Sequence, residues 1–293
     1  MRAKSFPPTN PPQTSIPLRT WDVFVQSLVP LMCLLLGAMV APASGAEAKP
    51  GSDDKQKIID EQTSVPLVPP KPAAANRNEL PPAFSKAIPT SVSDLKMIEA
   101  HVKALVARVS PAVVSVEVGD GSGSGVVITA EGLVLTAGHV CGGPNRNVNF
   151  TFPDGKSAHG KTLGVDLDSD TGLMRITEPG TWPHVPTGEL EHAGLGGWVL
   201  ALGHPGGFDL RRSLVVRLGR IIRIAPDALQ TDCTISPGDS GGPLFDMYGR
   251  VIGIHSYISS STADNFHVPI TAFYDSWSSL VKMERTSSRS PHD

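Results

Sequence analysis

A succession of short apolar runs, each closed by a turn, fills the chain from residue 113 to residue 270 and restricts its fold more than any other feature. The runs 113–118 and 133–135 are typical, and the turn at 130–132 directly precedes the second. Short runs with closely spaced turn residues predict an all-β sandwich or barrel. The 29 glycines and 27 prolines among 293 residues fit such a turn-rich fold better than a helical bundle.

Two segments outside these runs have helical periodicity. Ser91 and Asp94 have the spacing of a capping box, and apolar residues then recur every three or four positions up to Val109. Near the C-terminus, the segment 272–283 gathers apolar residues on one face of a helix: Phe273, Trp277, Leu280 and Val281. We therefore expect one helix before the strands and one after them.

Residues 1–46 have the pattern of an export signal: basic residues, an apolar run at 28–40, and then small residues. We expect cleavage after Ala46, with Ala43 and Ala48 as alternatives, and hence a periplasmic or secreted protein. An uncleaved membrane anchor is the alternative interpretation. The apolar run is shorter than the roughly 20 residues that a membrane span needs, which favours cleavage.

Charge and cysteine content limit the possible partners. The net charge of −3 offers no basic field for nucleic acid. The nine histidines are scattered without metal-ligand spacing, so we assign no metal and no cofactor. Once Cys33 leaves with the signal, Cys141 and Cys233 remain. By residue type alone they could form one disulfide or stay as two buried thiols.

The run PGDSGGPL, residues 237–244, surrounds Ser240 with glycines. Glycine adopts backbone angles and close approaches that other residues cannot. A cluster of glycines beside one serine indicates that backbone N–H groups are needed there as well as the hydroxyl. Acyl transfer has this requirement, because its nucleophile must lie beside donors aimed at the developing oxyanion.

Two further stretches supply the partners that a serine nucleophile needs. LTAGHV ends an apolar run with His139, and DSDTGLMRI places Asp170 directly before an apolar run. Histidine can take the serine proton, and a carboxylate holds the histidine in the correct tautomer. Either residue alone is commonplace, but His139, Asp170 and Ser240 together predict a catalytic triad.

These stretches, together with GSGSGVVI, ALGHPGG and GRVIGIHS, resemble the chymotrypsin-fold serine endopeptidases of the bacterial HtrA/Deg type over roughly residues 91–277. The resemblance implies two antiparallel six-stranded β-barrels, at about 91–185 and 190–271, with the site between them. His139 and Asp170 would lie on the first barrel and Ser240 on the second.

The resemblance also implies a domain organisation. A disordered Pro-rich linker is expected at 47–90, the protease domain at 91–285 and a tail at 286–293. HtrA/Deg proteins usually carry PDZ domains, for which this chain leaves no room. Cys141 and Cys233 would lie on different barrels, too far apart for a disulfide, so two free buried thiols are expected.

In the family, the N–H groups of Gly238 and Ser240, with Asp239 between them, would form the oxyanion hole. HtrA-type enzymes usually have Asn at the position of Asp239. In animal trypsins an Asp at this position pairs with a new N-terminus made by activation cleavage. No activation sequence precedes the first barrel here. Asp239 is therefore expected to need either another partner or solvent, and an imperfectly formed oxyanion hole is expected in the resting state.

The substrate pocket of this fold would be lined by Thr234 and Ile235 and by the strand end Ser256, Tyr257 and Ile258, which could pair with an extended peptide. With no acid in the pocket, small aliphatic side chains are expected before the cut. His255 leaves a preference for Glu open, since it resembles the Glu-contacting histidine of bacterial glutamyl endopeptidases.

The expected function is a serine endopeptidase that acts through an acyl-enzyme on exported or unfolded polypeptides, with the oligomeric state left open. The alternatives are a catalytically silent peptide-binding module on the same fold and an esterase-like activity on a small molecule.

Overall fold

The computed structural model describes residues 66–74, 80–190, 193–212, 214–258 and 264–287. The predicted signal at 1–46, its cleavage sites and the tail beyond residue 287 lie outside these ranges. No helix within them is long and apolar enough to cross a membrane.

The first barrel is a closed antiparallel sheet with the strand order β1-β2-β3-β6-β5-β4. Its strands are β1 Val113–Val118, β2 Gly121–Val127, β3 Leu133–Ala137, β4 Asn147–Thr151, β5 Ser157–Asp166 and β6 Thr171–Ile176. Pairing of β1 with β4 closes the sheet and leaves no exposed strand edge.

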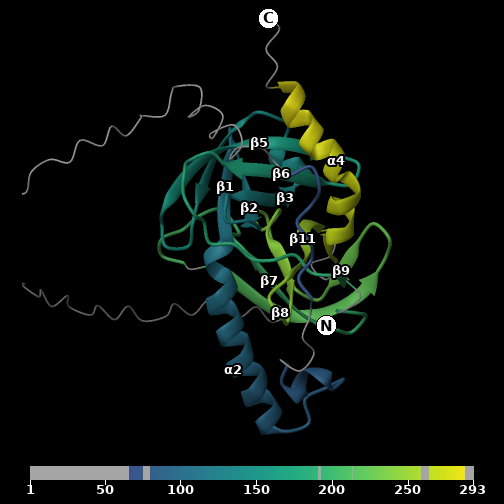
Figure 1. The fold of residues 1–293 in the computed structure, drawn as a ribbon. Coiled ribbons are helices and arrows are strands. Elements are labelled where there is room, and N and C mark those ends of the chain that lie inside the picture. The colour runs from purple at the N-terminus through teal and green to yellow at the C-terminus, as the bar shows by residue number, and fades with distance from the viewer. Residues whose placement is uncertain (1–65, 75–79, 191–192, 213, 259–263, 288–293) are drawn as a thin grey trace, which may run out of the picture. The chain divides into compact units, whose positions relative to one another are not determined.

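The second barrel is closed in the same way, in the order β10-β11-β12-β9-β8-β7. Its strands are β7 Trp198–Gly203, β8 Val215–Ile224, β9 Leu229–Thr231, β10 Pro243–Asp246, β11 Val251–Ile258 and β12 Asn265–Pro269. Figure 1 shows the two groups of strands one above the other, with β11 between them. The prediction of two six-stranded antiparallel barrels is confirmed.

Both predicted helices are present. Helix α2 spans Val92–Val109, and its N-cap Ser91 makes the capping box expected with Asp94. A short 3₁₀ helix, η3 Ser110–Ala112, follows it and contains Pro111, which cannot continue an α-helix. Helix α4 spans Ile270–Ser287 and buries its apolar face, including Phe273 and Trp277, against both barrels. The other helices within the described ranges, η2 Pro82–Ser85 and α3 Gly138–Cys141, are single turns.

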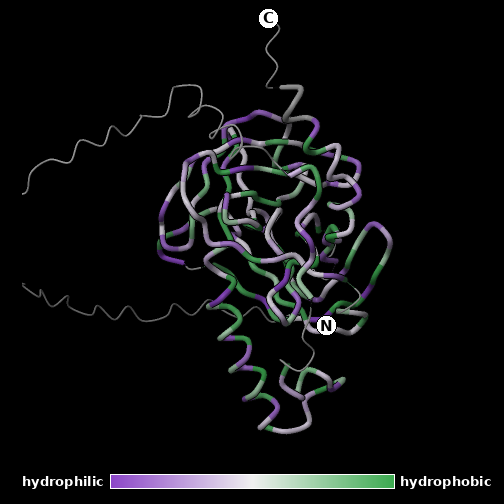
Figure 2. Tube along the Cα trace, in the orientation of Figure 1, coloured by the Kyte–Doolittle hydropathy of each residue, from purple (hydrophilic) through white to green (hydrophobic). Residues whose placement is uncertain are grey.

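Each barrel has its own apolar interior, and a third cluster joins the two. Val116, Val134 and Phe150 fill the first interior, while Val199, Ile221 and Leu244 fill the second. The joining cluster combines residues of both barrels with α4 and α2, and its largest members are Phe245, Phe273 and Trp277. Figure 2 shows apolar positions throughout the strands and alternating with polar ones along α2. This shared core fixes one barrel against the other.

The two cysteines lie in different interiors. Cys141 belongs to the core of the first barrel and Cys233 to that of the second, and both are free and buried. Burial raises the pKa of the Cys141 thiol to about 12 and that of Cys233 to about 11. The prediction of two free buried thiols is confirmed.

The Pro-rich segment before α2 differs from its prediction as a disordered linker. Residues 47–65 and 75–79 lie outside the described ranges, but 66–74 and 80–90 bind to the domain. Ala73 N–H donates to the Thr187 carbonyl (2.9 Å), and the carbonyls of Ala73 and Ala87 accept from Arg250 and Arg220 (2.7 and 2.9 Å). An extended Pro-rich chain leaves its carbonyls unpaired, and these arginines satisfy them.

Candidate active site

Two consecutive turns present Ser240. Asp239 N–H donates to the Ser236 carbonyl (2.9 Å), and Gly242 N–H donates to the Asp239 carbonyl (2.8 Å). Gly238 and Gly241 occupy the third positions of these turns with φ of 95° and 87°, in the left-handed region that type II turns require there. The glycines around Ser240 are therefore backbone requirements of its two turns.

Hydrogen bonds to two carbonyls orient the peptide groups on either side of Gly238 and Asp239. The Pro237 carbonyl accepts from Gly206 N–H (2.8 Å), and the Asp239 carbonyl accepts from Gly242 N–H. In a trans peptide the C=O and N–H point in opposite directions. Anchoring the two carbonyls therefore turns the N–H groups of Gly238 and Ser240 away from those anchors.

Ser124 on β2 ties the Ser240 turn to the first barrel. Its hydroxyl donates to the Gly238 carbonyl (2.8 Å) and accepts from His204 N–H (2.9 Å), and its own N–H donates to the Ser240 carbonyl (2.8 Å). A Cβ at Gly241 would lie 2.1 Å from the Ser124 carbonyl oxygen, so only glycine fits there. The sequence interpretation missed Ser124, although the run GSGSG contains it.

His139 and Asp170 meet at one end of the first barrel. His139 follows β3 in the short helix α3, and its Nδ1 lies 2.9 and 3.1 Å from the two carboxylate oxygens of Asp170. The backbone N–H of His139 also donates to this carboxylate (2.9 Å). Asp168 instead lies in a turn with Asp166, to whose carboxylate its N–H donates. Of the three nearby acids, Asp170 is the one bonded to His139.

Ser256 connects this pair to Ser240. Its hydroxyl donates to Asp170 Oδ2, and its main-chain oxygen accepts from the Ser240 hydroxyl at 3.2 Å. The structure thus brings His139, Asp170 and Ser240 into one hydrogen-bonded cluster through Ser256, with Ser240 Oγ directed at Ser256 and not at His139. Contacts between nucleophile and base are often loose without substrate and tighten on binding.

Comparison with known proteins agrees with this geometry. A family model described as a trypsin-like peptidase domain matches residues 123–254. The chain is 36% identical over 160 residues to the putative serine protease HhoA of Synechocystis sp., covering 51% of this chain and 40% of that protein. It is 35% identical over 174 residues to a probable periplasmic serine endoprotease, DegP-like, of Pseudomonas putida, covering 56% and 36%.

Solved structures give the same relationship. The HtrA-type protease AlgW with tripeptide superimposes with a TM-score of 0.54 at 28% identity, covering 61% of this chain and 63% of that one. Deg5 superimposes with a TM-score of 0.53 at 28% identity, covering 63% and 95%. Residues 123–254 therefore match a trypsin-like peptidase domain, and the chain is similar in sequence and fold to proteases of the HtrA/Deg type. It spans only 36–40% of the length of the two curated relatives above.

The electrostatics of the peptidase domain distinguish His139 from Asp170. The hydrogen bond to Asp170 raises the pKa of His139 above its ordinary value of 6.5, although partial burial opposes this. For Asp170, burial raises the pKa of the carboxyl, but the hydrogen bonds from His139 and Ser256 outweigh it and lower that pKa overall. The pair therefore favours an ionised acid beside a histidine that titrates above pH 6.5.

The sequence-predicted pocket residues separate into two groups. Tyr257 and Ile258 at the end of β11 are exposed, and so is Thr234, whereas Ile235 is buried. His255 is completely buried: its Nε2 lies 3.2 Å from the Leu202 carbonyl and its Nδ1 lies 2.9 Å from His267 Nδ1. This differs from the prediction of a substrate-contacting histidine, because both ring nitrogens of His255 have interior partners.

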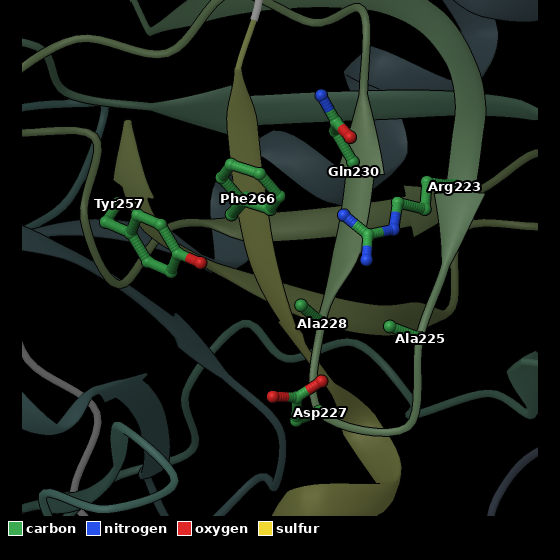
Figure 3. A pocket seen from close by; sticks show the side chains of 7 residues that line it. All are labelled: Arg223, Ala225, Asp227, Ala228, Gln230, Tyr257 and Phe266. Atoms are coloured by element: carbon green, nitrogen blue, oxygen red, sulfur yellow. The ribbon is translucent and has the colours of Figure 1, made fainter. Parts of the chain in front are cut away.

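A surface cavity of about 170 Å³ lies beside the exposed end of β11 in the peptidase domain. Tyr257 and Phe266 stack on one side of it, with ring centroids 4.8 Å apart. Figure 3 shows these rings beside Arg223, Gln230 and the turn that joins β8 to β9; the full lining is Arg223, Ala225, Asp227, Ala228, Gln230, Tyr257 and Phe266. The cavity is next to the strand that sequence reasoning predicted to bind substrate.

Asp239 has a partner inside the second barrel. Its carboxylate is fully buried, and Arg217 on β8 binds both oxygens, with Nη1–Oδ1 at 3.0 Å and Nη2–Oδ2 at 2.7 Å. Burial raises the pKa of this carboxyl despite the lowering effect of Arg217.

Among the described residues, no group of three or more His, Cys, Asp or Glu side chains could hold a metal ion.

Proposed function

We propose that this chain is a serine endopeptidase in which Ser240 is the nucleophile, His139 the general base and Asp170 the orienting acid. The observation that carries the proposal is the cluster itself: the Asp170 carboxylate bonds His139 Nδ1 and the Ser256 hydroxyl, and Ser256 accepts from Ser240. A half-buried carboxylate bonded to a histidine, beside a serine held between glycines, is the arrangement that acyl transfer requires.

In this mechanism the Ser240 hydroxyl rotates from the Ser256 carbonyl to His139 and attacks the scissile carbonyl carbon. His139 takes the serine proton, and Asp170 stabilises the imidazolium. The N–H groups of Gly238 and Ser240 bind the oxyanion, and each such donor contributes roughly 2.7–4 kcal/mol in the transition state. His139 then returns the proton to the leaving amine, and water hydrolyses the acyl-enzyme by the same route.

The proposed substrate is an extended polypeptide that pairs with residues 256–258. On the side of β10, backbone pairing of β11 stops at His255, whose N–H donates to the Gly242 carbonyl and whose carbonyl accepts from Gly241 N–H. Beyond that point the strand edge beside Ser240 is open to a substrate strand. Tyr257 and the adjoining cavity would then receive a side chain further from the cut (Figure 3). This edge favours a peptide over a small ester.

We propose that the domain acts outside the cytoplasm, on exported or unfolded proteins. Two observations support this location: the predicted export signal at 1–46, and a relative named as a periplasmic serine endoprotease.

Labelling with a fluorophosphonate probe tests the proposal, because an activated serine attacks the probe's phosphorus, displaces fluoride and becomes phosphonylated. Wild-type protein should be labelled at Ser240 and should hydrolyse casein, whereas Ser240→Ala should do neither while melting at the wild-type temperature. Ser236→Ala is the matched control, four residues earlier in the same loop, and should keep labelling. A folded wild-type protein that is not labelled would indicate the binding module, and labelling without casein hydrolysis would indicate an esterase.

A further inference from the structure

Asp239 stands directly before Ser240, and its buried carboxylate would be costly without a counter-charge. Arg217 supplies that charge in the strongest geometry available, two parallel N–H···O bonds of 3.0 and 2.7 Å. Oδ2 also accepts from Ser236 N–H at 2.8 Å. The carboxylate therefore has no need of a charged chain terminus.

The second barrel is shaped to admit this ion pair. Arg217 lies opposite Ala201 in the β7–β8 ladder, and Gly203 lies two residues further along β7. A Cβ at Gly203 would lie 2.4 Å from Asp239 Oδ1, so only glycine leaves space for the carboxylate. The side chain of Arg217 is mostly shielded, with 17% exposed. Strand β7 thus leaves the space for the Asp239 carboxylate at Gly203, and strand β8 directs the positive charge of Arg217 at it.

Asp239 is also the residue between the two proposed oxyanion donors. Its N–H belongs to the peptide that follows Gly238, and its carbonyl belongs to the peptide that carries Ser240 N–H. Any rotation of the Asp239 backbone would re-aim at least one of those donors. Holding its side chain therefore holds the donors, together with the anchors at Pro237 and Gly242.

We propose that Arg217 is the positioning residue of the oxyanion loop 237–242: its ion pair with Asp239 keeps the N–H groups of Gly238 and Ser240 aimed at the substrate carbonyl, so the loop needs no activation cleavage. This inference rests on the proposed function. Arg217 is then the partner of Asp239, which stands where HtrA-type enzymes usually have Asn.

Substitutions of Arg217 separate a positioning role from simple stabilisation of the fold. Arg217→Met leaves a buried carboxylate without its partner, and the rate constant for fluorophosphonate labelling of Ser240 should fall about 100-fold or more, the effect of losing one oxyanion donor. With a peptide substrate, kcat should fall while KM changes little. Arg217→Lys keeps the charge but not the two-bond geometry, so its rate should lie in between.

The double variant Arg217→Met/Asp239→Asn is the decisive comparison. It removes both charges and restores the residue usual in the family, so labelling should recover to within about 10-fold of wild type. Asp239→Asn alone should lose more activity than the double variant. Arg211→Met, an exposed arginine in the β7–β8 connection, is the matched control and should label at the wild-type rate.

The outcomes separate this inference from the proposed function. If wild-type Ser240 is not labelled, the proposed function fails. If wild type is labelled and a folded Arg217→Met protein is labelled equally fast, the positioning role is overturned. If Arg217→Met does not melt cooperatively, the double variant decides: recovery supports the role, and a folded double variant with no recovery overturns it.

Discussion

Among single residues, Asp170 has the most unusual backbone in the site. Its φ of 52° lies in the left-handed region, which costs a non-glycine residue about 1–2 kcal/mol. Hydrogen bonds offset this: the Asp170 carbonyl accepts from Gly138 N–H at 2.9 Å, and its carboxylate binds His139 and Ser256. The left-handed conformation of Asp170 brings its carboxylate within hydrogen-bond distance of His139 Nδ1. Strained backbone conformations of this kind cluster at functional sites.

Asp170→Asn tests the electrostatic role of this carboxylate without changing its shape, since Asn tolerates the same backbone angles. The amide should favour the wrong tautomer of His139 and lower kcat by about 10⁴. Asp170 raises the pKa of His139, and the neutral base is the active form. The acid limb of kcat/KM should therefore lie above pH 6.5 in wild type and move to lower pH in the variant.

Asp168→Asn is the control for this pH–rate experiment. Its carboxylate lies two residues earlier, and it should leave both the rate and the acid limb unchanged. A large loss in Asp168→Asn together with a normal Asp170→Asn would show that the proposed acid is misassigned.

At the scale of elements, strand β11 combines a buried half with an exposed end. The register with β12 shifts between His255 and Tyr257, so a bulge interrupts the pairing there. Both His255 and Ser256 are buried, while Tyr257 and Ile258 are exposed. Consecutive side chains of a strand point to opposite faces, so His255 faces the barrel interior and Ser256 faces Asp170. The bulge at Ser256 lies where the strand passes from its buried half to its exposed end.

The cleavage preference should follow from this strand. His255 is buried and neutral, and neither Thr234 nor Ile235 provides a charge. A charged substrate side chain would have no partner, so cleavage should follow small aliphatic residues in preference to Glu, Lys or Arg. Sequencing the products of a proteome-derived peptide digest measures this, with Ser240→Ala as the background. Cuts mainly after Glu would overturn the aliphatic preference, and cuts mainly after Lys or Arg would overturn the pocket assignment.

For the molecule as a whole, a buried histidine pair makes stability depend on pH. The Leu202 carbonyl only accepts, so His255 Nε2 carries a proton, and its Nδ1 accepts from His267 Nδ1–H. His267 Nε2 then accepts from the Thr231 hydroxyl. Both rings are neutral in this network, and burial lowers the pKa of His255 well below 6.5 and that of His267 to about 3.

Acidification should therefore weaken the fold. Above pH 6.5 both histidines are neutral in the folded and unfolded states and contribute no pH dependence. Below pH 6.5 these two histidines bind protons in the unfolded chain but not in the folded barrel. The free energy of unfolding should therefore fall by up to about 1.4 kcal/mol per pH unit for each histidine. Urea unfolding between pH 6.5 and 4.5 measures this, above the range in which most carboxylates titrate.

Two variants complete this experiment. His267→Gln removes one titrating group, so its unfolding midpoint should be lower at neutral pH but should change less on acidification. The exposed His184→Gln is the control and should follow the wild-type curve. An equally steep decline in His267→Gln would contradict the assignment of the pH dependence to the buried pair.

The sequence by itself determined the features that depend on local pattern. Turn-separated apolar runs predicted an all-β sandwich or barrel, the resemblance of the motifs implied two six-stranded barrels, and the capping box at Ser91 predicted the start of α2. The stretches LTAGHV, DSDTGLMRI and PGDSGGPL predicted His139, Asp170 and Ser240 as a triad, because these residue types occur at strand ends beside turn glycines.

Only the tertiary structure decided the partners of buried charges and the directions of side chains. Arg217 as the partner of Asp239, Ser124 as the tie between the barrels and His255 as an interior residue depend on strand register, a bulge and barrel closure. These bring together positions 22, 114 and 12 residues apart for the pairs Arg217–Asp239, Ser124–Gly238 and His255–His267. Contacts over such separations carry no local sequence signal, because they are set by how the closed sheets pack.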